Sequence, residues 1–210
     1  MAHFNLQEQE QLTKLAYFWR DWGKYLMAVI AIIILAYTSN VIWVANAASN
    51  ATKAAVIYNQ LNTAVKAKDT ATVYKLADNL EKEYPRVEYS SMGSIIAAKT
   101  AYDARDMAKA TAYLNWTIKK TKDKGMAAIA MLRLADVYID QQKFDLAINT
   151  LMQDHDASFD ALFYTKRGDS YVARNDLNKA RDAYKEAIEK AGQDQNMVGT
   201  IQMKLDVLGG

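Results

Sequence analysis

The chain opens with a long apolar run and then changes to short amphipathic patterns. Residues 25–45 read YLMAVIAIIILAYTSNVIWVA and contain no charged residue. A helix of about 20 residues is about 30 Å long, which matches the thickness of a membrane's hydrocarbon core. Aromatic side chains favour the membrane interface, and they stand at both ends of the run, at Tyr17, Phe18, Trp19, Trp22, Tyr25 and Trp43. We therefore predict one transmembrane helix over residues 25–45.

Two alternatives concern this N-terminal region. In residues 1–24, apolar side chains recur every three or four positions, which predicts either an amphipathic helix on the membrane surface or the start of the spanning helix; they are Leu12, Leu15, Trp19 and Trp22. The sequence Ala45-Asn46-Ala47 could also serve as a signal-peptide cleavage site. The apolar run is longer than is usual for a signal peptide, and acidic residues precede it, so a membrane anchor is favoured.

The distribution of basic residues predicts the orientation of the anchor. Lys14, Arg20 and Lys24 precede the span, whereas Lys53 alone follows within a dozen residues. Basic residues favour the cytoplasmic side. We expect residues 1–24 in the cytoplasm and residues 46–210 on the opposite side. The reverse topology would place the C-terminal part in the cytoplasm.

Beyond the span, small and aromatic residues recur at a fixed spacing. In the segment 161–190 the recurring positions are Gly168, Tyr171, Ala180, Tyr184 and Ala187. The same chemistry occurs 33 residues earlier at Ala135, Tyr138, Ala147 and Leu151, and more weakly at Ala98, Tyr102, Ala110 and Leu114. This spacing is typical of tetratricopeptide repeats, in which the small residues pack where two helices cross.

The sequence therefore predicts an all-α protein in which a transmembrane helix precedes an α-solenoid. Only one proline and eight glycines interrupt the helical composition. We expect four helix pairs over residues 54–87, 91–124, 128–160 and 161–194, with a terminal helix over 195–208 that caps the open end. Short polar turns join the helices of each pair. Because residues 45–54 contain no glycine or proline, the spanning helix can continue into the first pair.

Composition and motifs argue against several functions. The 26 basic and 24 acidic residues nearly cancel, so nucleic acid is not an expected partner. The chain has no cysteine, and its two histidines, His3 and His155, fall on opposite sides of the predicted span. We expect no catalytic residues, no metal and no cofactor. The acidic residues around His155 form no recognisable cation loop, and a polar connection is the preferred interpretation.

Two charged groups have both a functional and a structural interpretation. Asp136 and Asp169 occupy matching positions of adjacent repeats, where an acid–base pair is conceivable but binding-surface residues or ion-pair partners are favoured. A second group, Lys119, Lys120, Lys122 and Lys124, follows the second helix of one repeat. These lysines suit the negative end of a helix dipole, and a patch for lipid headgroups or acidic partners is the alternative.

Several segments resemble the YfgM family of bacterial inner-membrane proteins along almost the whole chain. They are QEQLTKLAYFWRDWGKYL, LEKEYPRVEY, MLRLADVYI and RGDSYVARNDLNKARDAYKEA. The resemblance implies an inner-membrane protein with a cytoplasmic N-terminus and a periplasmic repeat domain. It also implies association with the SecYEG translocon and a PpiD-like membrane-anchored chaperone, and binding of unfolded or nascent secretory proteins.

We therefore predict a membrane-anchored adaptor or chaperone that binds proteins and is not an enzyme. The first helix of each tetratricopeptide pair lines the concave face, so the predicted contact residues are Lys99, Tyr102, Asp136, Ile139, Asp169 and Val172. Membrane lipid should contact the protein through its spanning helix. The alternative is a non-catalytic scaffold in envelope complex assembly or stress signalling, which would hold a fixed folded partner.

Overall fold

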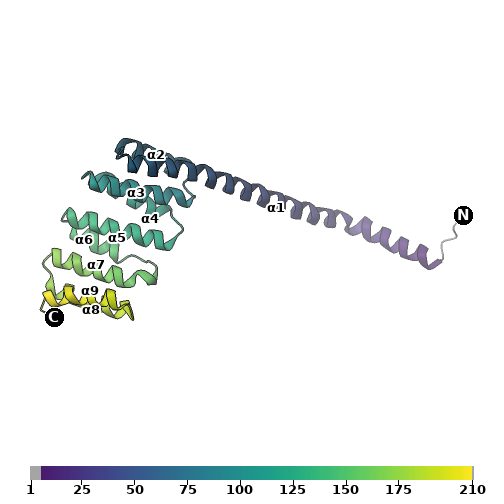
Figure 1. The fold of residues 1–210 in the computed structure, drawn as a ribbon. Helices are drawn as coiled ribbons and strands as arrows, with labels where there is room; N and C mark the ends of the chain where they lie inside the picture. The colour runs from purple at the N-terminus through teal and green to yellow at the C-terminus, as the bar shows by residue number, and fades with distance from the viewer. Residues whose placement is uncertain (1–5, 210) are drawn as a thin grey trace. The chain divides into compact units, whose positions relative to one another are not determined.

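The computed structural model describes residues 6–209, and these are helical without any strand (Figure 1). They form two compact units that meet between Ser49 and Asn50. Residues 1–5, including His3, lie outside the described part. The predicted fold class is confirmed, because one long apolar N-terminal helix is followed by a tetratricopeptide-like series of helices.

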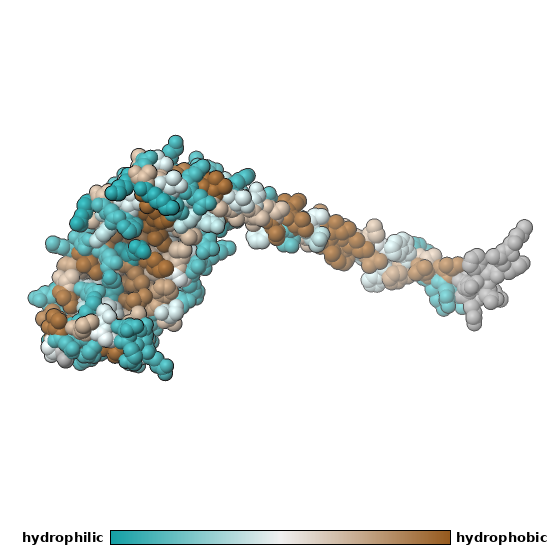
Figure 2. Space-filling model, in the orientation of Figure 1, coloured by the Kyte–Doolittle hydropathy of each residue, from teal (hydrophilic) through white to brown (hydrophobic). Residues whose placement is uncertain are grey.

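Helix α1 (Leu6–Lys66) contains the predicted span and extends well beyond it. Within the described residues it is the one helix that is long and apolar enough to cross a membrane. None of its apolar window is buried, and hydrophobic side chains cover this stretch in the space-filling view (Figure 2). The helix has no break before residue 25, where a separate surface helix would end. It also has no break over residues 45–54, as expected for a segment without glycine or proline.

The unit from Asn50 onwards begins with the last turns of α1, which pack against α2 (Thr70–Glu83). Three further pairs follow: α3 (Glu88–Asp103) with α4 (Met107–Lys120), α5 (Lys124–Asp140) with α6 (Phe144–Leu151), and α7 (Asp160–Ala173) with α8 (Leu177–Ala191). A short 3-10 helix (Ala157–Phe159) precedes α7, and α9 (Gln195–Val207) follows the last pair. From α2 onwards each helix packs on the next, and α5 also contacts both α3 and α7.

The turn within each pair has the same backbone geometry. Its middle residue has a positive φ of 57–64°, a region that non-glycine residues rarely adopt; these residues are Lys68, Arg105, Gln142 and Asn175. In three of the four turns the next residue is an aspartate that caps the following helix, as Asp106 does by accepting a hydrogen bond from the Lys109 N–H at 3.0 Å. The cap satisfies a backbone donor that would otherwise have no partner.

The small residues predicted at the helix crossings are buried, namely Ala98, Ala135, Ala147, Gly168 and Ala180. The closest approach is at Gly168, where an added Cβ would lie only 2.3 Å from the Tyr184 ring. Gly93 plays the same part between α2 and α3, because a Cβ there would lie 2.7 Å from the Leu80 side chain. Larger residues would force these helices apart.

Helix α9 covers the end of the series with one apolar stripe. Ile201 and Leu205 are buried against the cluster that contains Tyr184 and Ala187. Met203, in the same apolar stretch of the sequence, is 64% exposed. Ile201 and Leu205 are one helical turn apart, whereas Met203 lies between them in sequence and therefore on the other side of the helix.

Candidate functional site

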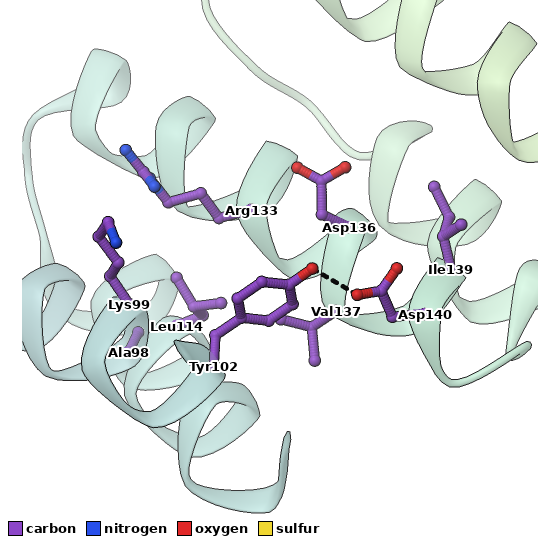
Figure 3. A pocket seen from close by; sticks show the side chains of 9 residues that line it. All are labelled: Ala98, Lys99, Tyr102, Leu114, Arg133, Asp136, Val137, Ile139 and Asp140. Carbon is purple, nitrogen blue, oxygen red and sulfur yellow. Dashed lines mark hydrogen bonds between the residues drawn. The ribbon is translucent and has the colours of Figure 1, made fainter. Parts of the chain in front are cut away.

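The first helices of three pairs, α3, α5 and α7, present a row of polar and partly apolar side chains. We call this surface the groove face; it includes Lys99, Tyr102, Asp136, Ile139, Asp169 and Val172. Four of the six predicted contact residues line one cavity of about 200 Å³ between α3 and α5 (Figure 3); they are Lys99, Tyr102, Asp136 and Ile139. The tertiary fold thus brings together residues that lie almost 40 positions apart. We call this cavity the α3–α5 pocket.

The α3–α5 pocket has an apolar floor and a polar rim. Ala98, Leu114 and Val137 supply buried apolar surface. At the rim, the Tyr102 hydroxyl donates a hydrogen bond to the Asp140 carboxylate (Figure 3). This hydrogen bond raises the pKa of Tyr102, so the phenol stays protonated and the carboxylate keeps its partner.

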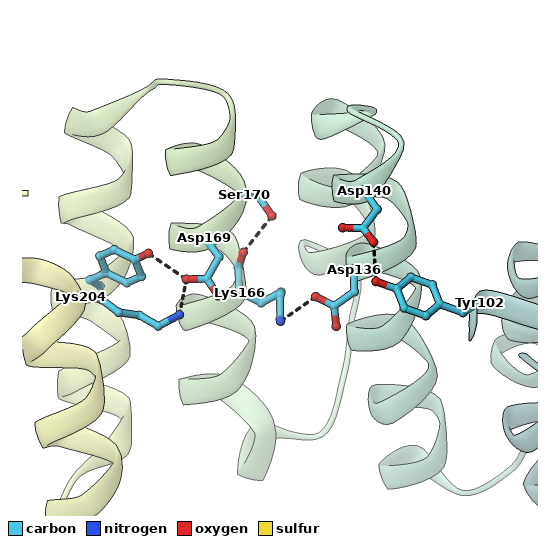
Figure 4. Close-up of polar contacts among 8 residues, drawn as sticks. Tyr102, Asp136, Asp140, Lys166, Asp169, Ser170 and Lys204 are labelled. Atoms are coloured by element: carbon cyan, nitrogen blue, oxygen red, sulfur yellow. Dashed lines mark hydrogen bonds and ion pairs between the residues drawn. The ribbon is translucent and has the colours of Figure 1, made fainter. Parts of the chain in front are cut away.

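A series of ion pairs joins neighbouring helices along the groove face (Figure 4). Lys166 of α7 lies 2.7 Å from the Asp136 carboxylate of α5, and Lys204 of α9 lies 2.6 Å from the Asp169 carboxylate of α7. Asp169 also accepts a hydrogen bond of 2.8 Å from the buried Tyr184 hydroxyl. Because the charged side chains remain partly exposed, each ion pair contributes at most about 1 kcal/mol to stability. Their main effect is to fix where the side chains lie.

Asp169 and Val172 do not line the α3–α5 pocket. Both lie on α7, one repeat further along the groove face, where Asp169 is paired with Lys204 and Val172 is partly exposed. The matching aspartates of adjacent repeats are therefore both engaged by lysines, as expected for ion-pair partners. Whether these residues contact a partner stays a prediction.

Sequence reasoning missed Arg133 and Asp140, which also line the pocket. A signal for Arg133 was present, because it stands 33 residues before Lys166 and therefore occupies the same position of the repeat. No comparable signal marked Asp140. Its role at the pocket depends on the position of the Tyr102 hydroxyl, which belongs to the preceding repeat and donates a hydrogen bond to it.

His155 and its acidic neighbours organise the connection between α6 and α7. The imidazole stacks on the Phe163 ring with centroids 3.6 Å apart, and its Nε2 lies 3.3 Å from an Asp160 oxygen. Asp156 accepts hydrogen bonds from the backbone and hydroxyl of Ser158. Among the described residues no group of three metal-ligating side chains comes together. These contacts hold the connection between α6 and α7 in place.

The fold and the groove face together define the class, a tetratricopeptide-like helical repeat protein with a long apolar N-terminal helix. The family model described as a tetratricopeptide repeat-like domain matches residues 16–210. An ancillary SecYEG translocon subunit of Neisseria gonorrhoeae is 32% identical over 97% of this chain and 98% of its own length. Proteins of the same name from Escherichia coli K12 and Haemophilus influenzae are 25% and 23% identical over at least 95% of each chain.

The chain therefore belongs to the family of ancillary SecYEG translocon subunits, which is the YfgM family that its sequence resembles. The likeness includes both the apolar helix and the repeats, because it extends over nearly the full length of these relatives.

Proposed function

We propose that this protein is a single-pass inner-membrane protein that associates with the SecYEG translocon and binds segments of secreted proteins on its groove face. The observation that carries the proposal is the likeness to ancillary SecYEG translocon subunits over nearly the whole of both chains. The finer elements, a cytoplasmic N-terminus and a periplasmic repeat unit, rest on the excess of basic residues before the apolar run.

The apolar part of α1 would act as the anchor. Its large side chains are exposed in the described structure, and a bilayer is the environment that would cover them, with lipid as the contact. An anchored binding surface stays near the channel exit, so a low intrinsic affinity for each emerging segment is raised by a high local concentration. Weak binding also allows release.

The groove face suits protein segments better than a small molecule or cofactor. The α3–α5 pocket, at about 200 Å³, is smaller than the usual range of ligand sites, about 300–1,000 Å³, but large enough for one side chain. The apolar floor can bind an apolar side chain, and the ordered polar groups at the rim can bind the backbone of the same segment.

A PpiD-like membrane-anchored chaperone is the second partner that we propose, on the strength of the resemblance to the YfgM family. A fixed scaffold in envelope assembly or stress signalling is the competing function. One observation favours the scaffold. The ion pairs of the groove face order its side chains before binding, and pre-ordered side chains suit a single folded partner because little further ordering is required.

Photo-crosslinking in the native membrane tests these functions. A photoreactive residue is placed at Lys99 or Val172 on the groove face, with Lys185, exposed on α8, as the matched control. We expect translocon subunits, a PpiD-like chaperone and secreted chains to be attached from the groove positions and not from the control. One folded envelope partner without secreted chains would establish the scaffold instead, and the absence of every translocon subunit would refute Sec association.

The orientation can be tested separately, because the chain has no cysteine of its own. Glu10→Cys and Lys185→Cys variants are treated with a membrane-impermeant maleimide on intact spheroplasts. We expect labelling at position 185 only. Labelling at position 10 only would place the repeats in the cytoplasm.

A further inference from the structure

The ion pairs of the groove face follow a rule that one repeat breaks. Twice in succession, a lysine pairs with an aspartate on the first helix of the preceding repeat. Lys166 of α7 pairs with Asp136 of α5, and Lys204 of α9, which follows the last pair, pairs with Asp169 of α7 (Figure 4). Arg133 of α5 occupies the same repeat position as Lys166. By the same rule it should pair with an acidic residue of α3.

The residue of α3 that corresponds to Asp136 is Lys99, as the alignment of Ala98 with Ala135 shows. Lys99 is itself paired with Asp103 on its own helix at 2.6 Å. In Figure 3, Lys99 and Arg133 point to the same side of the pocket, away from Asp136 and Asp140. Among the described residues, the Arg133 side chain has no partner in a hydrogen bond, an ion pair or a ring contact.

Most of the other charged side chains around the α3–α5 pocket have a partner of opposite charge. Asp136 is paired with Lys166 and Lys99 with Asp103, whereas Asp140 accepts a hydrogen bond from the neutral Tyr102 hydroxyl and keeps its negative charge. In Figure 3 the Asp140 carboxylate lies on the other side of the pocket from the Arg133 guanidinium. Among the described residues that line the pocket, the exposed Arg133 is therefore the cation without an anionic partner, and it lies next to an apolar floor. The complement of this arrangement is an anion that lies beside an apolar group.

We infer that the α3–α5 pocket binds an unfolded polypeptide segment that places an apolar side chain on the floor and a nearby Asp or Glu carboxylate on Arg133. The inference rests on the proposed protein-binding function and specifies its preferred sequence. In an extended chain, side chains two positions apart lie on the same side and are roughly 7 Å apart, so an acid within two positions of the apolar residue can reach the guanidinium. The planar guanidinium can bind a carboxylate through two parallel hydrogen bonds.

The test uses the full chain in detergent on an array of peptides of about a dozen residues that tile a secreted envelope protein. Each peptide is present in its native form, with Asp and Glu changed to Asn and Gln, and with large apolar residues changed to Ser. The variants are Arg133→Gln, Arg133→Lys and, as matched control, Arg86→Gln, which removes an exposed arginine from the α2–α3 connection.

We expect wild-type protein and Arg86→Gln to prefer peptides with an acid near an apolar residue, with affinity about three- to tenfold higher than for the amide forms. Arg133→Gln should lose this preference and keep the apolar requirement, and Arg133→Lys should keep part of it. The thermal stability of Arg133→Gln should be unchanged, because the guanidinium has no partner to lose.

Binding without acidic preference, or a preference that survives Arg133→Gln, overturns the inference while the protein-binding function stands. No binding to any peptide would overturn both.

Discussion

Replacing Gly168 with alanine should force apart the last helix pair. The Tyr184 ring of α8 lies directly on Gly168 of α7, and a Cβ there would be 2.3 Å from Cε1 and 2.5 Å from Cδ1 of that ring. Carbon atoms pack at about 3.5–4.0 Å, so the ring has to move by more than an ångström. The ring is held in place because it is buried and its hydroxyl donates to Asp169.

The cost can be estimated from these contacts. Overpacking a well-filled crossing costs about 1–3 kcal/mol, and loss of the Tyr184 hydrogen bond adds about 0.5–1.5 kcal/mol. The higher helix propensity of alanine offsets about 0.5–1 kcal/mol. We expect a net loss of about 2 kcal/mol, which lowers the Tm of a repeat unit of this size by about 4–8 °C.

The assay is thermal unfolding of the full chain in detergent, followed by far-UV circular dichroism. The matched control is Gly199→Ala in α9, where nothing lies within 4 Å of an added Cβ. That substitution should stabilise the repeat unit by about 0.5–1 kcal/mol, because alanine favours a helix over glycine. The two identical substitutions should therefore change the Tm in opposite directions.

A double-mutant cycle with Tyr184→Ala decides whether the ring is the cause. In that background Gly168→Ala should stabilise by about 0.5–1 kcal/mol, since the clash is gone and only the helix propensity of alanine remains, so the coupling energy should be about 2.5–3 kcal/mol. An equal cost in both backgrounds, or no measurable cost in the wild type, would refute the packing argument.

Three further predictions follow from particular contacts. Burial raises the pKa of Glu81, which accepts a hydrogen bond from Ser94, so the free energy of unfolding falls as pH rises through that pKa. Glu81→Gln should therefore stabilise the protein near neutral pH by less than about 1 kcal/mol and raise its Tm. This gain should vanish below about pH 4. A gain that persists at acid pH would contradict this cause. Asp106→Ala removes the cap of α4 and should cost about 0.5–2 kcal/mol in a melt, whereas Asp106→Asn should cost much less. Lys166→Ala should lower the Tm by no more than about 2–4 °C, because its ion pair with Asp136 is partly exposed and contributes at most about 1 kcal/mol, and a larger fall would show that the pair holds the helices together.

Much of the fold could be predicted because its determinants are local or periodic. The charge-free run over residues 25–45 predicts a long apolar helix on composition alone, and this run lies within α1. The recurrence of small residues such as Ala135 and Gly168 identifies the repeats, because only small residues fit where paired helices cross. The residues that share the groove face could also be predicted in part, since side chains at matching repeat positions point in the same direction; Lys99 and Asp136 are one such pair and line the same pocket.

The turn geometry and the pairing of charges could not be predicted in the same way. Lys68, Arg105 and Gln142 adopt a positive φ although their side chains do not favour it, because the packing of each helix pair fixes the turn. Met203 belongs to an apolar stretch in the sequence, yet it is exposed because the register of α9 buries Ile201 and Leu205 instead.

The sequence by itself determined the long apolar helix, the helical class and the repeat period, because hydrophobic length and side-chain periodicity suffice for these. The tertiary structure decided which equivalent positions become chemically different. Arg133 and Lys166 occupy the same position of two repeats, but Lys166 pairs with Asp136, whereas Arg133 points to the same side of the pocket as Lys99. That difference depends on which side chains two neighbouring helices bring together, and it leaves a free guanidinium beside the α3–α5 pocket.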